Sequence, residues 1–392
     1  MLLLSFVAWN GKAQSVETET SGAVATEVVA YNGNHQEGAM QVDYGLNVHY
    51  KAISIVAQPR LEVSSFDTHG VISDVAERSH RWVLNAREVY GRMDVSWADI
   101  RVGKQIIKPS IINGRIRPAQ WAPMDYIDPL QPERIGVPAV RLQLFDDTID
   151  GWYAPGETVS RMPETPWRPP LLSGVSGTNS KNTTDNGYGV RLKFRIQKTE
   201  LGVGFQHGQN FSPSPKIVQV GKQRQLVFVH NPVDQGFAQL STPLSDFIFE
   251  AEAAVVSETL PDSDRTHLPY VLSLRRQWQV GLFGDTIAGS LRYVGELGGS
   301  IASKDRKFDF RRNMKRSIFG RVKYSRSDLT YQLDGAFTAH DGGSYLLQPK
   351  LTYDRNRLRI EAATGLLGGS DKTFWGEFSG NDFFRLKLRI TL

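Results

Sequence analysis

Arginine and lysine residues that alternate with apolar residues are the most prominent candidates for chemistry in this sequence. Near the C-terminus, Arg385, Lys387 and Arg389 are separated by Leu386 and Leu388. A period of two predicts a β-strand with basic side chains on one face and apolar side chains on the other. A helix would mix the two kinds on each face. Rows of basic side chains raise the local electrostatic potential and attract anions.

Residues that could catalyse a reaction are few and dispersed. The chain contains no cysteine, which excludes thiol catalysis, disulfide bonds and Cys-ligated zinc or iron–sulfur sites. His340 and Asp341, with Ser344 close behind, are the nearest approach to a hydrolase site, in which such groups must converge. No HExxH, GxSxG or phosphate-binding loop motif occurs. We therefore predict that the protein is not an enzyme.

The paired acids Asp125 and Asp128 are the best metal-binding candidates. Together with nearby carbonyl oxygens they could hold Ca²⁺. However, Asp128 precedes Pro129, and an Asp before a proline is more often part of a turn. We therefore predict no metal site and no other cofactor.

Length and composition restrict the class of protein. The chain has 392 residues, with 46 Lys+Arg against 41 Asp+Glu and a formal net charge of +5. Hydrophobic residues make up 40%, enough to bury a core, which excludes a disordered chain. Outside the extreme N-terminus, no apolar run approaches the ~18 residues that a membrane-spanning helix needs. These numbers leave a soluble multi-domain protein or a β-rich one.

The N-terminus resembles the end of a secretory signal peptide. An apolar block from Met1 to Trp9 is followed by Gly11 and Ala13, small residues at the positions expected before a cleavage site. We predict that residues 1–13 are a signal-peptide remnant and that the protein is exported. The alternative is an N-terminal strand buried in the fold. For an exported protein without a membrane-spanning helix, the possible locations are the periplasm, the outer membrane and the medium.

The alternating pattern recurs along the chain and predicts an all-β fold. It covers residues 42–50, 190–197, 329–338, 345–353 and 384–392. A soluble β-sandwich also alternates, but these strands are mostly about ten to twelve residues long, close to the ~9–11 residues of a tilted membrane-spanning strand. Their mid-strand charges would line an aqueous interior while the apolar set faces lipid. We therefore predict a transmembrane antiparallel β-barrel that forms a single domain over residues 14–392.

Aromatic residues cluster near the predicted strand ends, as expected of side chains at a membrane interface. They are Tyr50, Trp82, Tyr90, Trp97, Tyr270, Tyr293, Tyr324 and Tyr353. Arg276 falls on the lipid-facing side, which costs roughly 2–4 kcal/mol at mid-membrane but little near an interface.

Connection lengths predict about eighteen strands. Tight connections alternate with long ones, which is the pattern of outer-membrane barrels with short periplasmic turns and long extracellular loops. Sixteen strands is the alternative. The predicted strands 149–155 and 216–230 have weak patterns, and the gap at 231–244 is longer than its side of the barrel predicts.

A barrel of this size has an interior that side chains alone do not fill. Loops 108–137 and 156–186 are long enough to fold into it, and their proline and tryptophan residues make them stiff and give them something to bury. We predict that one or both loops form a constriction. The alternative is that they pack over the rim. The candidate constriction residues are Trp121, Asp125, Tyr126, Asp128 and Glu133.

The predicted strand phases place more basic than acidic residues on the interior face. The basic residues, which are the selectivity candidates, are Arg141, Arg191, Lys193, Arg195, Arg275, Arg292, Arg321, Lys323, Lys350, Arg357, Arg359, Arg385, Lys387 and Arg389. The acidic residues are Glu250, Glu252, Glu296, Asp334 and Glu361. Such a lumen favours anionic solutes. The alternatives are a basic wall that faces an acidic plug or partner, and general solvation of the lumen.

Several short motifs resemble those of a porin-like bacterial outer-membrane β-barrel family of uncharacterised substrate. They are Arg87–Tyr90 followed by Asp99–Gln105, Met124–Leu130 followed by Gly136–Arg141, and the ending Gly380–Arg389. The resemblance implies a single-chain outer-membrane barrel that the barrel assembly machinery inserts through its C-terminal strand. Many such proteins end in Phe, whereas this chain ends in Leu392. That departure concerns recognition of the final strand and not the fold.

Together these patterns predict a porin-like channel of the cell outer membrane that passes small polar, anionic solutes through a basic lumen. Its expected partners are outer-membrane lipid, lipopolysaccharide, the barrel assembly machinery and small anionic solutes, with no nucleic acid. A second hypothesis is a translocation barrel that exports an anionic polymer or houses a partner within a larger envelope complex. A third is a soluble β-sandwich enzyme of the periplasm.

Overall fold

The computed structural model describes most of the chain. The described residues are 16–32, 36–64, 82–112, 118–119, 121–125, 130–156, 160, 167, 178–181, 186–210, 214–220, 223–259, 264–280, 284–298, 315–339 and 342–392. The signal-peptide prediction for residues 1–13 and the pair His340 and Asp341 fall outside these residues.

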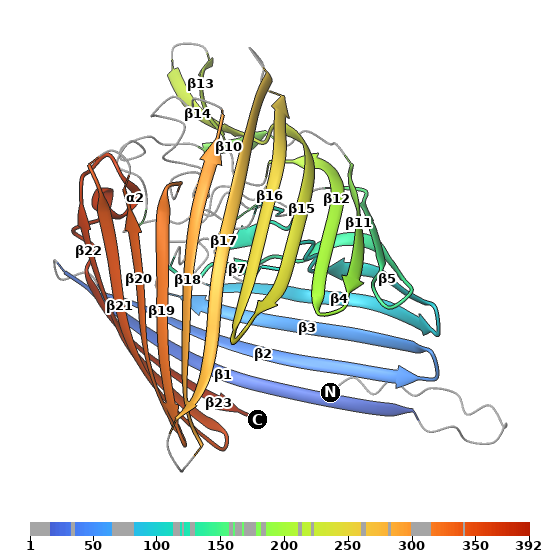
Figure 1. The fold of residues 1–392 in the computed structure, drawn as a ribbon, viewed down its shortest axis with the longest axis horizontal. Helices are drawn as coiled ribbons and strands as arrows, with labels where there is room; N and C mark the ends of the chain where they lie inside the picture. The colour runs from blue at the N-terminus through green and yellow to red at the C-terminus, as the bar shows by residue number, and fades with distance from the viewer. Residues whose placement is uncertain are drawn as a thin grey trace.

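Eighteen strands form one sheet that closes into a barrel (Figure 1). The barrel strands are β1 (Glu17–Tyr31), β2 (Gln36–Tyr50), β3 (Ile53–Ser64), β4 (Trp82–Val95), β5 (Ala98–Gln105), β8 (Val137–Leu144), β9 (Ile149–Ala154), β11 (Gly187–Ile196), β12 (Thr199–Gln209), β15 (Pro232–Leu244), β16 (Phe247–Thr259), β17 (Asp264–Val280), β18 (Asp285–Leu297), β19 (Ser317–Arg326), β20 (Leu329–Thr338), β21 (Ser344–Arg355), β22 (Leu358–Gly369) and β23 (Phe383–Thr391). Each strand pairs antiparallel with the next barrel strand along the chain.

The last strand closes the barrel by pairing with the first. The register of β1 with β23 runs from Ala23 opposite Thr391 to Tyr31 opposite Phe383. Beyond it, the Leu392 backbone N–H donates to the Gly22 carbonyl at 2.8 Å. A closed sheet has no edge strand, so its backbone groups are paired within the protein. Hydrocarbon offers no hydrogen-bond partner, which is why only helices and closed barrels span membranes.

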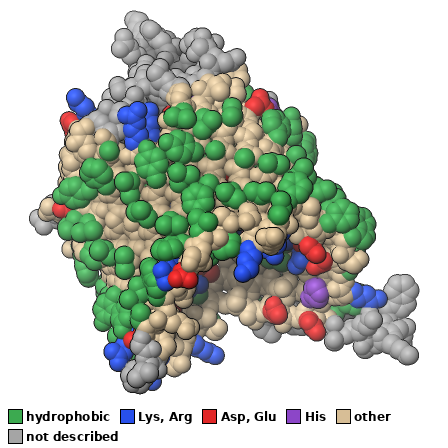
Figure 2. Space-filling view, in the orientation of Figure 1, with side chains coloured by type: hydrophobic (Ala, Val, Ile, Leu, Met, Phe, Trp, Pro, Cys, Tyr) green, Lys and Arg blue, Asp and Glu red, His purple; other side chains and the backbone are tan. Residues whose placement is uncertain are grey.

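Side chains alternate between a polar interior and an apolar exterior. On β23, Leu386 and Leu388 are exposed on the outer surface, whereas Arg385 on the opposite face is only 2% exposed. Figure 2 shows hydrophobic side chains over most of the outer face, with charged side chains mainly toward its borders. This exterior suits contact with lipid. The predicted all-β transmembrane barrel of about eighteen strands is confirmed.

The connections on one rim are tight, and the long connections lie on the other rim. Lys51, Gln197 and Ser327 lie in tight connections with positive φ angles of 53°, 55° and 48°, as two-residue hairpins require. The opposite rim carries the segments between β5 and β8 and between β22 and β23. The rim with the tight connections is called the turn rim below, and the opposite rim is called the loop rim. In outer-membrane barrels they face the periplasm and the cell exterior, respectively.

One of the predicted strands is wrong, although the count of eighteen is right. Instead of a barrel strand over residues 216–230, β13 (Ser214–Val220) and β14 (Gln223–Val229) form a separate three-stranded sheet with β10 (Thr178–Lys181). The barrel strand at this place is β15, which lies wholly within the predicted gap at residues 231–244. Its interior residues include the polar Gln235 and Gln239, and outward Gly236 and Ala238 are small, so hydrophobicity hardly alternates along it.

Two predictions about residues near the membrane interface have different outcomes. Arg276 is on the outer face of β17 at the turn rim, where its guanidinium group stacks over Phe247 and Trp278 and pairs with Asp246 at 2.6 Å. At this border of the membrane, the free-energy cost of a lipid-facing arginine is small. The interfacial position predicted for Tyr90 is wrong. Tyr90 lies on the interior face under the Arg101 guanidinium group, 5.8 Å from its ring centre.

Within the described residues, no helix is long and apolar enough to cross a membrane. The helix α2 (Phe374–Glu377) is a single turn between β22 and β23. Its aromatic residues are buried inside the loop rim.

The orientation of β23 predicts the effect of placing a charge on each face. Leu388→Arg puts a cation on the lipid-facing side near mid-strand and should lower the free energy of unfolding by about 2–4 kcal/mol. The control Lys387→Arg keeps the charge on the interior face and should change it by less than about 0.5 kcal/mol. Urea titration of the barrel in lipid vesicles measures both values. Equal effects of the two substitutions would contradict the assigned faces.

Candidate functional site: the lumen and its inserted loop

The described residues of the segment 106–136, called the inserted loop below, enter the barrel interior between β5 and β8. The Pro109 carbonyl accepts hydrogen bonds from Arg191 on β11 (3.1 Å) and from the Gln239 side-chain amide on β15 (2.8 Å). Both donors lie on the interior face of strands that do not neighbour β5 or β8. The loop therefore lies within the lumen and not over the rim.

A second attachment joins the inserted loop to β15 and β16. The Glu252 carboxylate accepts hydrogen bonds from the Ser110 hydroxyl at 2.6 Å and from the Ala119 backbone N–H at 2.7 Å. The Gln235 side chain donates its amide to the Pro118 carbonyl. Glu252, Gln235 and the other wall anchors are buried. Polar groups of the wall thus pair with polar groups of the loop.

Trp121, a predicted constriction residue, packs against the wall at β9 and β11. Its ring centre is 5.8 Å from that of Trp152 at an angle of 61°, and its indole N–H donates to the His207 carbonyl at 3.4 Å. A Cβ atom at Gly187 would lie 2.7 Å from the Trp121 ring. Glycine is therefore required at that place for the tryptophan to seat.

The other end of the inserted loop is attached to β3. Strands β6 (Met124–Asp125) and β7 (Glu133–Arg134) form a two-residue ladder, and Glu133 pairs with Arg60 on β3 at 2.7 Å. Asp125, Glu133 and Arg60 line a cleft of about 30 Å³, which has room for a single water molecule. The predicted constriction residues Tyr126 and Asp128 fall outside the described residues.

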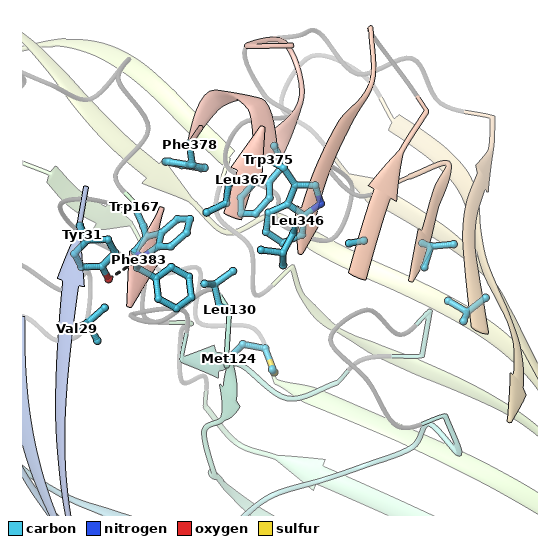
Figure 3. Packing of buried hydrophobic residues seen from close by; sticks show 14 of the residues in the cluster. Val29, Tyr31, Met124, Leu130, Trp167, Leu346, Leu367, Trp375, Phe378 and Phe383 are labelled. Carbon is cyan, nitrogen blue, oxygen red and sulfur yellow. Dashed lines mark hydrogen bonds between the residues drawn. The ribbon is translucent and has the colours of Figure 1, made fainter. Parts of the chain in front are cut away.

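An apolar cluster joins the inserted loop to the wall at β1 and β23 (Figure 3). Met124 and Leu130 of the loop belong to it, with Tyr31 and Phe383 from the wall. Trp167, from the second long loop, donates its indole N–H to the Tyr31 hydroxyl at 3.2 Å. Both loops that the sequence singled out thus place at least one tryptophan inside the barrel.

The segment around α2 also packs on this cluster, although the sequence pattern did not predict it. Trp167 packs against Phe378 with ring centres 5.3 Å apart, and Phe374 lies 4.7 Å from Trp375. All three residues of this segment are buried. The sequence feature that could have indicated this packing is the group of aromatic residues in a connection otherwise rich in Gly, Ser and Asp.

All but one of the predicted basic residues lie on barrel strands with their side chains on the interior face. They are Arg141 on β8, Arg191, Lys193 and Arg195 on β11, Arg275 on β17, Arg292 on β18, Arg321 and Lys323 on β19, Lys350 on β21, Arg359 on β22, and Arg385, Lys387 and Arg389 on β23. Arg357 is the exception. It lies in the exposed turn at the turn rim, because β22 begins at Leu358.

The interior face holds acids and bases that the sequence pattern did not count among the lumen residues. The acids include Glu27, Glu37, Asp43, Glu62, Glu88, Asp99, Asp150, Glu200, Glu258 and Asp354. The bases include Arg60, Arg92 and Arg101. These additions remove most of the predicted excess of bases. Many of the bases pair with such acids. Glu27, for example, binds Arg385 at 3.1 Å and Lys387 at 3.4 Å.

Base and acid differ in exposure along the wall from β16 to β22. The side chains of the bases in the pairs Arg275–Glu250, Arg321–Asp334 and Arg359–Glu361 are 52%, 55% and 49% exposed, against 8%, 17% and 9% for their acids. The carboxylates therefore lie against the wall while the guanidinium groups reach into water. Arg359 also lies directly opposite Arg389 on β23.

Other predicted bases are buried and do not face water. Arg141 makes a two-point ion pair with Asp150, with both contacts at 2.8 Å. Arg191 contacts the same carboxylate at 3.3 Å and Asp147, in the turn between β8 and β9, at 2.8 Å. Since Arg191 also binds Pro109, this network joins the turn rim to the inserted loop. These arginines therefore support the structure.

The electrostatics of Asp147 follow from the same network. Partial burial alone would raise the pKa of this carboxyl group. The Arg191 guanidinium group, the Gln143 amide and the Lys193 ammonium group outweigh that effect and hold the pKa of Asp147 below its ordinary value. The ionised carboxylate is therefore the form that the folded barrel stabilises.

Of the residues considered for catalysis, Ser344 begins β21 at the loop rim, and His340 and Asp341 lie outside the described residues. Of the metal-binding candidates, Asp125 lies in β6, and Asp128 lies outside the described residues. In the part of the chain that the structure describes, no group of three or more His, Asp or Glu side chains could hold a metal ion.

Several solved outer-membrane proteins share this architecture. OccAB1 from Acinetobacter baumannii matches with a TM-score of 0.57 over 96% of each chain, at 8% identity. OpdK from Pseudomonas aeruginosa matches with a TM-score of 0.55 over 96% of this chain and 99% of that one, at 12% identity. OccK2 from the same organism, in complex with glucuronate, matches with a TM-score of 0.54 over 96% and 98%, at 13% identity.

No family model and no curated protein matches the chain. At these identities, the likeness to solved structures shows a common fold. That fold is a porin-like outer-membrane barrel, as the sequence motifs implied.

The environment of Asp147 predicts a pH dependence. Because its folded-state pKa is lowered, its ionised form stabilises the fold above the ordinary pKa of 3.8, and this contribution is lost as the pH falls further. Asp147→Asn should therefore flatten the loss of stability below about pH 4. Urea unfolding in detergent micelles at a series of pH values measures this. Asp146→Asn, in the same turn and exposed, is the control, and an equal slope in both variants would contradict the assignment.

Proposed function

We propose that this outer-membrane barrel is a passive channel for small polar solutes. The observation that carries the proposal is a closed barrel with an apolar exterior and a charged interior, narrowed by a loop that is attached to several wall strands. Eighteen strands enclose more space than wall side chains fill, so the remaining interior is open to water. OccK2 was solved with glucuronate and OpdK with vanillate, both of which carry a carboxylate group.

We propose further that the channel prefers anionic solutes. The number of basic residues does not support this, because acids accompany them. The support comes from exposure. From β16 to β22 the guanidinium groups of Arg275, Arg321 and Arg359 are about half exposed, whereas Glu250, Asp334 and Glu361 beside them are far less exposed. Arg359 also pairs with the exposed Asp354 near the turn rim. A solute that moves along this wall meets cationic groups first, and their potential raises the local concentration of anions.

The attachments of the inserted loop favour small solutes over an exported polymer. The loop is fixed to β3, β11, β15 and β16 by hydrogen bonds and an ion pair, and it packs in an apolar cluster. Passage of a polymer would require these buried contacts to break. In the proposed setting, lipid and lipopolysaccharide surround the barrel, and the barrel assembly machinery inserts it through β23.

Single-channel recording in planar bilayers tests the proposal. The purified barrel should give stepwise currents, and a salt gradient should give a reversal potential of the sign expected for anion preference. Replacing the exposed bases in Arg321→Gln, Lys323→Gln and Arg359→Gln together should move that potential toward zero, because fewer cationic groups then face the water.

The matched control is Arg276→Gln, which removes the same charge from the outer surface of the barrel. It should leave the reversal potential unchanged. A silent wild-type protein would contradict the channel, and an unchanged potential in the triple variant would contradict the anion preference.

A further inference from the structure

We propose that Glu252 is the positioning residue of the inserted loop, so that this one carboxylate fixes the width of the water path. The second part of this statement rests on the proposed channel function, whereas the first concerns the structure alone. No sequence motif marks Glu252, which is one of several acids on the interior face.

The geometry gives Glu252 two different partners on the loop. One carboxylate oxygen accepts from the Ser110 hydroxyl at 2.6 Å and the other from the Ala119 backbone N–H at 2.7 Å. Ser110 and Ala119 lie on opposite sides of residues 113–117 along the chain. A single side chain therefore joins to β16 the two parts of the loop that precede and follow residues 113–117, called its first and second arm.

Three further polar wall anchors each hold only one arm. Arg191 and Gln239 bind the Pro109 carbonyl on the first arm, and Gln235 binds the Pro118 carbonyl on the second arm. These three side chains donate to backbone carbonyl groups. Glu252, in contrast, accepts hydrogen bonds from loop donors. Its two carboxylate oxygens hold both arms at one point of the wall.

Because Glu252 is buried, its carboxylate depends on hydrogen bonds from the protein. Glu252 is 2% exposed and lies between Gln239 on β15 and Val271 on β17. The Arg292 guanidinium group, on the interior face of β18, interacts electrostatically with both Glu252 and Glu250. A buried carboxylate is costly unless it is paired and hydrogen-bonded. Two of its hydrogen-bond donors belong to the loop. If the loop left the wall, the buried carboxylate would lose these two hydrogen bonds, which is unfavourable.

Glu250 provides an internal comparison. It lies on the same face of the same strand, and its side chain is also nearly buried, but its partner is Arg275 on the neighbouring β17 at 3.2 Å. Glu250 thus joins strand to strand, whereas Glu252 joins strand to loop. The two residues are both glutamates and both nearly buried, so the main difference between them is the partner that each one binds.

A cysteine probe tests the attachment without relying on conduction. The chain has no cysteine, so Ile112→Cys introduces a unique thiol at a fully buried position of the inserted loop. In the full-length barrel in vesicles, a water-soluble methanethiosulfonate reagent should label it slowly. Adding Glu252→Ala should speed labelling by roughly tenfold or more, because two hydrogen bonds to a carboxylate are lost. Adding Glu250→Ala should leave the labelling rate unchanged.

A conservative variant separates positioning from general loss of stability. Glu252→Gln retains a carbonyl oxygen for the Ala119 N–H, so labelling should be intermediate between that of the parent and that of Glu252→Ala. It also keeps the test available if Glu252→Ala does not fold. Heat-modifiable mobility on a gel reports whether each barrel is intact. Intact Glu252 variants that label no faster than the parent would overturn the positioning role.

Single-channel recording of the same proteins tests the effect on the water path. Glu252→Ala should give larger and noisier open-channel currents than the parent. Faster labelling with unchanged currents would overturn the claim that Glu252 fixes the width. If labelling responds as expected but even the parent conducts no current, the positioning role stands and the proposed channel function fails.

Discussion

Backbone N–H and C=O groups that lie in hydrocarbon need hydrogen-bond partners from the protein itself. Closure of β23 onto β1 meets this constraint, and the rest of the structure follows from it. Once the sheet is closed, strict alternation sends every second side chain to lipid and the others to the interior. The exterior must then be apolar, and the interior has to accommodate whatever charge the chain carries.

The interior accommodates its charge by pairing, and exposure then decides what a solute would meet. Buried networks such as that of Arg141, Asp150 and Arg191 hold strands and loop together, whereas Arg321 and Arg359 reach into water above their acids. Removing one member of a buried pair leaves an uncompensated charge and is strongly destabilising. The same residue type thus has a structural role at one depth of the lumen and an electrostatic role at another.

The sequence was most informative where alternation was strict. The strands of the C-terminal half, such as β19 to β23, show it clearly, whereas β15 has polar Gln235 on one face and small Gly236 on the other and was missed. Tryptophan marked the loops that fold inward. The acids of the first strands were not assigned to a face, because outward positions of β1 hold small or polar residues. The role of Glu252 was out of reach, since it and Ser110 lie 142 residues apart.

The central claim is that one face of each strand meets water inside a closed barrel and the other meets lipid. Labelling of single cysteines on β19 in lipid vesicles tests it most directly, because the natural chain has none. Arg321→Cys and Lys323→Cys should react with a water-soluble thiol reagent, and Ile318→Cys and Val322→Cys should not. Reaction at all four positions alike, or a protein that stays in solution without lipid or detergent, would contradict the account.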